Sequence, residues 1–253
     1  RYLRDGALVE IAGRELFANP EIVTVEGAGT FEGYPNRDST AYLKTYDVEG
    51  ARSMFRGTLR NLTLCETWKA MGDLGLYDDA NLSLPGGTFR ALMAHLAGVS
   101  ADADVEAAVA ARVGIARGSR PIEKLTWLGM FAADPLPAES ISPLDALVAR
   151  MVERLQYKPG ERDMIVLQHS FVAEYPDRTE RLRSTLVAFG EPGGETAMSR
   201  TVGLPAAIGV LRVLDGTIAE RGVVVPVSPA VYNPILDELA TLGIAFQEER
   251  EVV

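Results

Sequence analysis

The pattern of apolar and polar positions divides the chain into three parts. Up to residue 61, short apolar runs at 7–11 and 22–25 alternate with glycine-rich turns, which predicts short strands joined by loops. From 62 to 156, apolar residues recur at helical spacing, and after 157 strand-like and helical stretches alternate. This order predicts an α/β protein, in which an α+β sheet domain carries a helical insert.

The middle part predicts five helices. The first contains Trp68 and Met71 and ends at Gly75, because glycine commonly terminates a helix in the left-handed conformation. Ser142 is a suitable N-cap for the fifth helix, and a proline opens the fourth. The other four helices are expected over residues 89–96, 104–112, 121–128 and 143–155. We therefore expect an all-helical insert over residues 62–156.

The last part predicts a hairpin followed by α/β structure. Residues 163–172 and 180–189 read as two strands around a turn at Tyr175-Pro176-Asp177. After them we expect helices at 196–202 and 205–214, a buried strand at 223–227, a helix at 231–242 and a strand at 244–249.

These elements imply a discontinuous domain. Residues 1–61 and 157–194 are expected to share one mixed sheet, from which the helical part 62–156 is inserted. Residues 195–253 are expected to form a separate α/β stretch. The chain opens with neither Met nor an apolar signal core, so we expect further sequence before Arg1.

Charge and composition exclude several classes of function. The net charge of −10 argues against binding nucleic acid or anionic membranes, which requires a basic surface. No run of about 18 uncharged apolar residues occurs, so no membrane span is expected. A single cysteine, Cys65, permits no internal disulfide and favours a reducing compartment, which we take to be the cytoplasm. Two histidines and one cysteine are too few for a His/Cys metal site.

Two glycine-rich loops are weak candidates for nucleotide binding. In the loop from Gly27 to Gly33, the third glycine is one place too late for the dinucleotide fingerprint, and Pro35 opposes the helix that should follow. The loop from Gly190 to Gly194 does precede a helix, but Glu191 and Glu195 would repel phosphate. We assign no cofactor-binding residue to this chain.

The arginines offer a better candidate site. Arg56 and Arg60 share a face whether the segment is helical or, together with Thr58, extended. Two guanidinium groups side by side suit bidentate binding of carboxylates. Taken alone, this pattern is explained more simply by solvated arginines. We interpret His169 and Cys65 as packing residues, and no residue stands out as a catalytic acid or base.

Several phrases of the sequence together resemble the saccharopine dehydrogenase family. They are Phe31-Glu32-Gly33-Tyr34-Pro35-Asn36-Arg37-Asp38-Ser39, Met54-Phe55-Arg56-Gly57-Thr58-Leu59-Arg60, Cys65-Glu66-Thr67-Trp68, Trp127-Leu128-Gly129, Glu161-Arg162-Asp163-Met164-Ile165 and Thr196-Ala197-Met198-Ser199-Arg200-Thr201-Val202-Gly203-Leu204-Pro205. The resemblance extends from about Val9 to Val253 and corresponds to the C-terminal, substrate-binding part of the glutamate-forming enzymes. The family's N-terminal Rossmann domain has no counterpart in this sequence, and in the family the C-terminal stretch packs on that domain.

The resemblance implies an oxidoreductase of lysine metabolism. Its reaction is the NADPH-dependent reduction of the imine formed by glutamate and 2-aminoadipate 6-semialdehyde, giving saccharopine, or the reverse. It implies Asn36, Arg37, Arg56 and Arg60 as substrate-binding residues, NADP or NAD as cofactor of the full-length enzyme, no cofactor on this chain alone, and a homodimer. Two alternatives stay open: a detached module that binds dicarboxylic amino acids without catalysis, and a related imine reductase such as carboxynorspermidine dehydrogenase.

Overall fold

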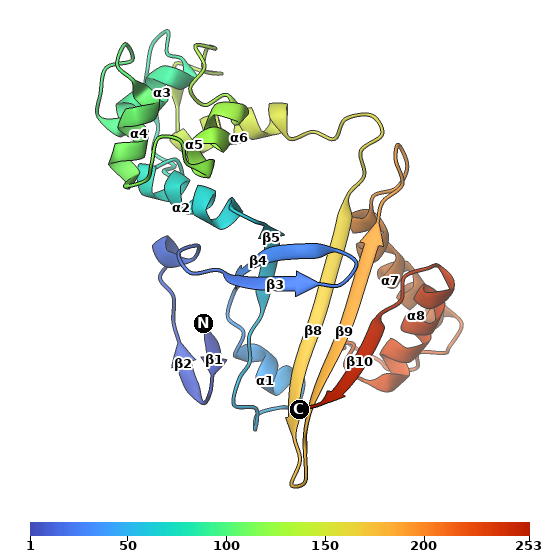
Figure 1. Ribbon diagram of the computed structural model, residues 1–253. Coiled ribbons are helices and arrows are strands. Elements are labelled where there is room, and N and C mark those ends of the chain that lie inside the picture. The colour runs from blue at the N-terminus through green and yellow to red at the C-terminus, as the bar shows by residue number, and fades with distance from the viewer. The chain divides into compact units, whose positions relative to one another are not determined.

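The computed structural model describes all residues from Arg1 to Val253 and divides them into two compact units. Unit 1 comprises Arg1–Val23, Thr30–Thr40 and Ala51–Gln156. Unit 2 comprises Thr24–Gly29, Ala41–Gly50, which contains the short helix α1 (Ala41–Thr45), and Tyr157–Val253. Figure 1 shows the elements of both.

Short antiparallel strands form the N-terminal region. β1 (Tyr2–Arg4) and β2 (Ala7–Val9) make a hairpin whose turn, Asp5-Gly6, has positive φ at both residues. A 3-10 turn at Gly13–Glu15 follows. A three-stranded sheet in the order β3-β4-β5 is built from β3 (Glu21–Val25), β4 (Gly29–Pro35) and β5 (Gly57–Asn61). The strands predicted near 7–11 and 22–25 are thus present.

All five predicted helices of the middle part are present and share one core. They are α2 (Leu64–Leu74), α3 (Phe89–Ala97), α4 (Val105–Val113), α5 (Arg120–Leu128) and α6 (Pro143–Arg154). Leu92, Met93 and Leu125 are almost completely buried in that core. The region is not entirely helical, because β6 (Leu82–Ser83) pairs with β7 (Ser140–Ile141) and places Leu82 and Ile141 against the same core.

Local capping explains why these helix boundaries were predictable. Ser142 Oγ accepts a hydrogen bond of 3.0 Å from the Asp145 N–H at the start of α6, as expected for an N-cap. Gly75 ends α2 with φ +95°, a conformation that glycine adopts without a steric cost.

The main sheet of unit 2 has the order β10-β9-β8. β8 (Met164–Glu174) and β9 (Thr179–Phe189) form the predicted hairpin, and β10 (Gln247–Val252) pairs with β9. Buried Glu180 on β9 accepts hydrogen bonds from the guanidinium groups of Arg178 and Arg250. The effect of these bonds exceeds that of burial, and the pKa of Glu180 is lowered. The resulting ion pairs join the start of β9 to the end of β10.

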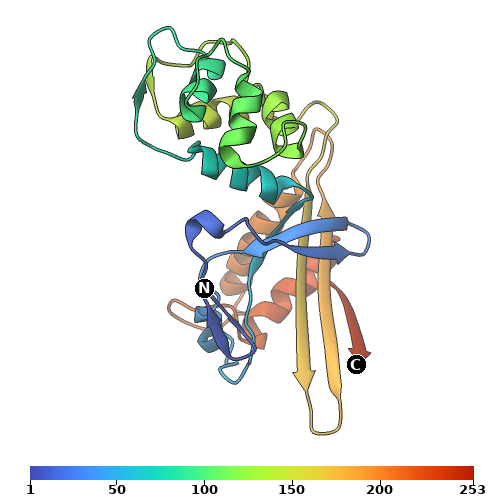
Figure 2. The ribbon, with the colours of Figure 1, turned by 60° about the vertical axis from the view of Figure 1, so that its left-hand side comes forward.

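Two helices cover one face of this sheet. α7 (Ala197–Leu214) and α8 (Pro229–Thr241) lie on the same side in both ribbon views, while the tip of the β8–β9 hairpin extends beyond them (Figures 1 and 2). The shared core is small and consists of Leu186, Ile208, Leu239 and Ile244.

The strand pairing differs from the single mixed sheet that the sequence predicted. The combination of helices and strands is confirmed, but residues 29–61 and 164–189 form separate, fully antiparallel sheets. The predicted boundary at residue 194 falls inside unit 2, because β10 adds to β9 and α7 packs on the sheet.

Two local predictions in the C-terminal part were wrong. The two helices expected around Pro205 are the single helix α7, since proline's fixed φ is compatible with a helix and only one backbone donor is lost. Residues 223–227 form neither a strand nor a buried segment, and Val225 is 57% exposed. An apolar run forms a strand only when it can hydrogen-bond to a neighbouring strand, and no strand pairs with residues 223–227.

α7 also has the length and composition of a membrane-crossing helix, which is weak evidence by itself. It contains Arg200 and Arg212, and it contributes Leu204 and Ile208 to the core of unit 2.

Candidate functional site

Three of the four candidate binding residues, Asn36, Arg56 and Arg60, lie along one face of the β4–β5 pair. The register pairs Glu32 with Arg60 and Tyr34 with Thr58, and it continues to Asn36, whose N–H donates to the Arg56 carbonyl at 2.9 Å. Because side chains alternate along a strand, Arg56, Thr58 and Arg60 point to the same side. Of the two arrangements that the sequence allowed for these arginines, the extended one is present.

Aromatic rings form a platform beneath Arg60. The rings of Phe17, Tyr34 and Trp68 meet edge to face, with centroids 4.9 to 6.0 Å apart. The Arg60 guanidinium lies 5.5 Å from the centroid of Trp68 and donates to the Leu59 carbonyl at 2.9 Å. Stacking on an aromatic face orients a guanidinium and leaves its edge available to a carboxylate.

Asn36 and Arg37 open the turn that follows β4. The half-buried Asn36 donates its side-chain N–H to Thr58 Oγ at 2.7 Å, so its amide is held across the ladder. Arg37 is exposed and has a φ of +63°, unusual for a residue with a side chain. Asp38 holds this turn by accepting bonds from Thr40 and from the Arg1 guanidinium, and these bonds lower the pKa of Asp38.

Glu32 is buried on the same face but does not pair with Arg60. Its two carboxylate oxygens accept the backbone N–H groups of Thr63 (2.7 Å) and Cys65 (2.9 Å) at the start of α2. Burial by itself would raise the pKa of Glu32, but these two bonds and the nearby Lys124 lower it overall. Glu32 is therefore ionised at neutral pH, and its charge is directed at the helix end.

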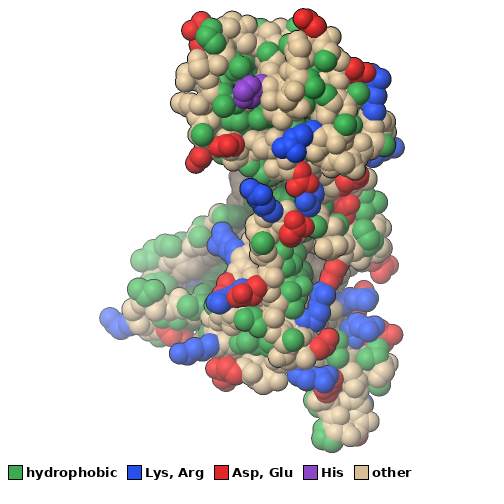
Figure 3. Space-filling view, turned by 90° about the vertical axis from the view of Figure 1, so that its left-hand side faces the viewer, with side chains coloured by type: hydrophobic (Ala, Val, Ile, Leu, Met, Phe, Trp, Pro, Cys, Tyr) green, Lys and Arg blue, Asp and Glu red, His purple; other side chains and the backbone are tan.

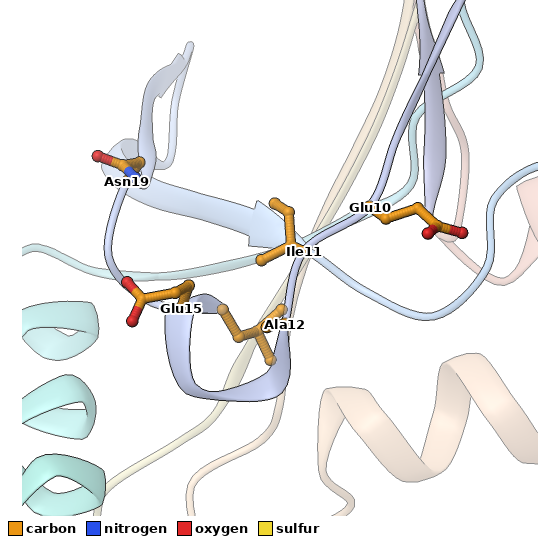
Figure 4. Close-up of a pocket in the computed structure, with 6 residues that line it drawn as sticks. Glu10, Ile11, Ala12, Glu15 and Asn19 are labelled. Atoms are coloured by element: carbon orange, nitrogen blue, oxygen red, sulfur yellow. The ribbon is translucent and has the colours of Figure 1, made fainter.

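Two shallow hollows of the molecule are not lined by the candidate arginines. One, of about 220 Å³ in unit 1, lies between Glu15 and Asn19 on one side and Glu10 on the other, with Ile11 and Ala12 between them (Figure 4). Two carboxylates make it unsuitable for an anionic ligand. The other, of about 370 Å³ in unit 2, is lined by His169, Phe246 and apolar residues of α8.

Arg37, Arg56 and Arg60 are all exposed, and none of them lines either of these hollows. On the face shown in Figure 3, lysine and arginine side chains are interspersed with acidic ones. No group of three or more His, Cys, Asp or Glu side chains could hold a metal ion.

Neither glycine loop fits the pyrophosphate of a dinucleotide. Residues from Gly27 to Gly33 belong to the β3–β4 hairpin, where no helix N-terminus is present. The N-terminus of α7 is occupied, because Asp163 accepts the N–H groups of Ala197 (2.7 Å) and Met198 (2.8 Å). Gly190 makes room for this carboxylate, since an added Cβ would lie 2.1 Å from Asp163 Oδ1.

Comparison with known proteins identifies the family. Residues 1–244 match the model of the saccharopine dehydrogenase C-terminal domain. The chain belongs to this family.

Named relatives agree with this assignment. The chain is 37% identical over 258 residues to saccharopine dehydrogenase [NADP(+), L-glutamate-forming] of Saccharomyces cerevisiae, covering 98% of this chain and 58% of the relative. It is 34% identical to the mitochondrial alpha-aminoadipic semialdehyde synthase of Rattus norvegicus, covering 99% of this chain and 28% of that protein. The solved structure of the apo, histidine-tagged L-Glu-forming saccharopine dehydrogenase from S. cerevisiae superposes with a TM-score of 0.89 at 33% identity, covering 99% of this chain and 58% of that one. The chain thus spans little more than half of its fungal relatives.

In this saccharopine dehydrogenase C-terminal domain, the substrate-binding role of the arginines stays a prediction, and nothing in the sequence indicated the contacts that orient Arg60. The roles of Phe17, Trp68 and Glu32 depend on contacts between segments that are distant in the chain, and periodicity carries no signal for such contacts. Cys65 is buried, and burial followed by Glu32 raises the pKa of its thiol to about 12, in keeping with a packing role. The His169 ring is parallel to that of Phe171 and tilted by 42° against that of Phe246.

Proposed function

We propose that this chain is the substrate-binding part of a saccharopine dehydrogenase of the glutamate-forming type. The full-length protein would reduce the imine of glutamate and 2-aminoadipate 6-semialdehyde to saccharopine, or catalyse the reverse reaction. The observation that carries this proposal is the β4–β5 face, on which Asn36, Arg56 and Arg60 lie together within a family whose named members act on saccharopine.

The charges on this face suit the proposed substrate. Saccharopine has three carboxylates, and the Arg60 guanidinium contacts the Trp68 ring and the Leu59 carbonyl, neither of which neutralises its charge. A bidentate arginine–carboxylate contact is stronger than a neutral hydrogen bond, and lysine does not reproduce its geometry. Asn36 adds a side-chain carbonyl that can accept a bond from a substrate amine.

The cofactor is assigned to another part of the full-length protein. NADP(+) is named for the relatives, whereas the loops of this chain do not fit a dinucleotide. The surface that would meet such a domain is the exposed apolar side of α7, where Val202 is 65% and Leu214 is 77% exposed. We propose that a nucleotide-binding domain covers this side of α7.

A second copy of the chain is the other proposed partner. β8 is an edge strand of its sheet, with Phe171 and Val172 more than half exposed. Long apolar edge strands tend to pair with another strand. We therefore propose a cytoplasmic homodimer joined along β8. Sedimentation should give twice the protomer mass for the wild-type protein and the protomer mass for Val172→Pro.

The substrate proposal is tested by steady-state kinetics of the full-length protein. Arg37→Lys, Arg56→Lys and Arg60→Lys should each raise the KM for saccharopine, by about 30-fold or more where the contact is desolvated, with NADP+ affinity unchanged. Arg112→Lys, an exposed arginine of α4, is the matched control and should change nothing. If all three variants behave like Arg112→Lys, these arginines are only solvated and the proposal fails. Absence of any saccharopine turnover would favour a binding module or another imine substrate.

A further inference from the structure

The junction between β5 and α2 is built around a buried carboxylate from a neighbouring strand. β5 ends at Asn61 and α2 begins at Leu64, with Thr63 between them at φ +67°. In this left-handed conformation the Thr63 side chain makes no capping bond. Glu32 accepts the N–H of Thr63 itself and that of Cys65 in the first turn of α2, and its charge is also favoured at a helix N-terminus.

This arrangement keeps Glu32 and Arg60 apart although they are direct cross-strand partners. Opposite charges in that position ordinarily attract and form an ion pair. Here one oxygen of Glu32 accepts the N–H of the N-cap residue Thr63 and the other accepts the N–H of Cys65 in α2, while Arg60 lies over Trp68 of the same helix. The helix end thereby holds the acid that would otherwise neutralise the arginine.

Lys124 completes the junction from α5. Its ammonium donates to Thr63 Oγ at 2.7 Å, and it lies close enough to Glu32 for each charge to favour the ionised form of the other. Burial nevertheless lowers the pKa of Lys124 overall. The negative charge of Glu32 is thus directed at the helix end and Lys124, while the contacts of the Arg60 guanidinium are the Trp68 ring and the Leu59 carbonyl.

We propose that Glu32 is a positioning residue for substrate binding. By capping α2 it fixes Trp68 relative to β5, and by turning away from Arg60 it leaves that guanidinium for a substrate carboxylate. This inference rests on the proposed function, because it gives Glu32 an effect that passes through Arg60.

The test is a double-mutant cycle in the full-length protein with saccharopine as the varied substrate. Glu32→Gln leaves a side chain of the same size that can accept only one of the two N–H groups, and it should raise the KM about tenfold with kcat within about twofold. In the Arg60→Ala background the same change should have almost no further effect, because the arginine through which it acts is gone. Glu66→Gln, an exposed carboxylate in the first turn of α2, is the matched control and should leave the KM unchanged.

The outcomes separate this inference from the proposed function. If Arg60→Ala raises the KM but Glu32→Gln does not, or if their effects simply multiply, the positioning role is wrong and the substrate site stands. If Arg60→Ala leaves the KM unchanged, both are wrong. Should Glu32→Gln fail to fold, Lys124→Met takes its place: it removes the bond to Thr63, and a KM rise that disappears in the Arg60→Ala background supports the inference, whereas an unchanged KM overturns it.

Discussion

The helical region of unit 1 and the helix-covered sheet of unit 2 are both rich in apolar residues, but they use them differently. In α2 to α6 the large side chains converge on one continuous core, with Leu92 and Met93 fully buried. In unit 2 the core is limited to Leu186, Ile208, Leu239 and Ile244, while much of α7 remains exposed. The first region buries most of its large apolar side chains in its own core, whereas the second exposes an apolar surface of the kind that marks interaction sites.

The largest effect should come from the core of the helical region. Leu92→Ala removes a side chain with 0% exposure and should lower the free energy of unfolding by about 2–5 kcal/mol. Leu211→Ala in α7, where Leu211 is 52% exposed, should cost less than about 0.5 kcal/mol in this chain. Urea denaturation measures both changes in the free energy of unfolding. Equal changes for the two variants would show that the two regions do not differ in how they use their apolar side chains.

A smaller effect should show whether the exposed side of α7 is an interface. Val202→Glu places a charge there and should lower the stability of the full-length protein by about 1–3 kcal/mol if a domain covers the site. Val152→Glu is the matched change on α6, where the valine is similarly exposed and should tolerate it. Thermal unfolding of the two variants decides the matter, since identical midpoints would mean that α7 faces solvent in the full-length protein as well.

The smallest effect distinguishes the helix caps of the two regions by pH. Burial raises the pKa of Asp163, but the N–H groups of Met198 and Ala197 outweigh this and lower it overall, so its stabilising effect is present above about pH 4 and is lost as the pH falls through the folded-state pKa. Asp163→Asn should cost about 1 kcal/mol at pH 7 and nothing at a pH where wild-type Asp163 is itself protonated. Thr88→Ala at the neutral N-cap of α3, where the Thr88 hydroxyl oxygen accepts the Ala91 N–H, should cost about as much at pH 7 and keep that cost in acid. A cost of Asp163→Asn that is the same at both pH values would contradict this account.

More could be predicted from the sequence for the helical region of unit 1 than for the sheets. Helix boundaries were predictable where the determinants are local, as with Ser142 at the start of α6 and Gly75 at the end of α2. Sheet pairing depends on which distant strand is available, so the separation into antiparallel sheets and the exposed run at 223–227 could not be foreseen. Pro205 misled because a proline inside a helix costs one donor without necessarily ending the helix.

The candidate site shows a similar limit. The spacing of Arg56, Thr58 and Arg60 predicted a shared face, which the ladder confirms, but their part in substrate binding stays a prediction. Glu32 was noted only as a member of a family phrase, and Trp68 only as a member of such a phrase and of a predicted helix. Their link to Arg60 needs three segments to meet: β4, β5 and the start of α2.

Gly190 shows how an absent side chain can be as constrained as a buried one. The space that a Cβ would take is filled by the Asp163 carboxylate, so even alanine would push the acid away from the end of α7. Natural variation at this turn should therefore be very uneven. Gly193, three positions later, has no neighbour within 4 Å of an added Cβ and is restricted only by its φ of +71°, which asparagine can share. Among homologues, Gly190 should therefore be replaced less often than Gly193, because Gly190 is constrained by the space that Asp163 fills and Gly193 only by its backbone angle.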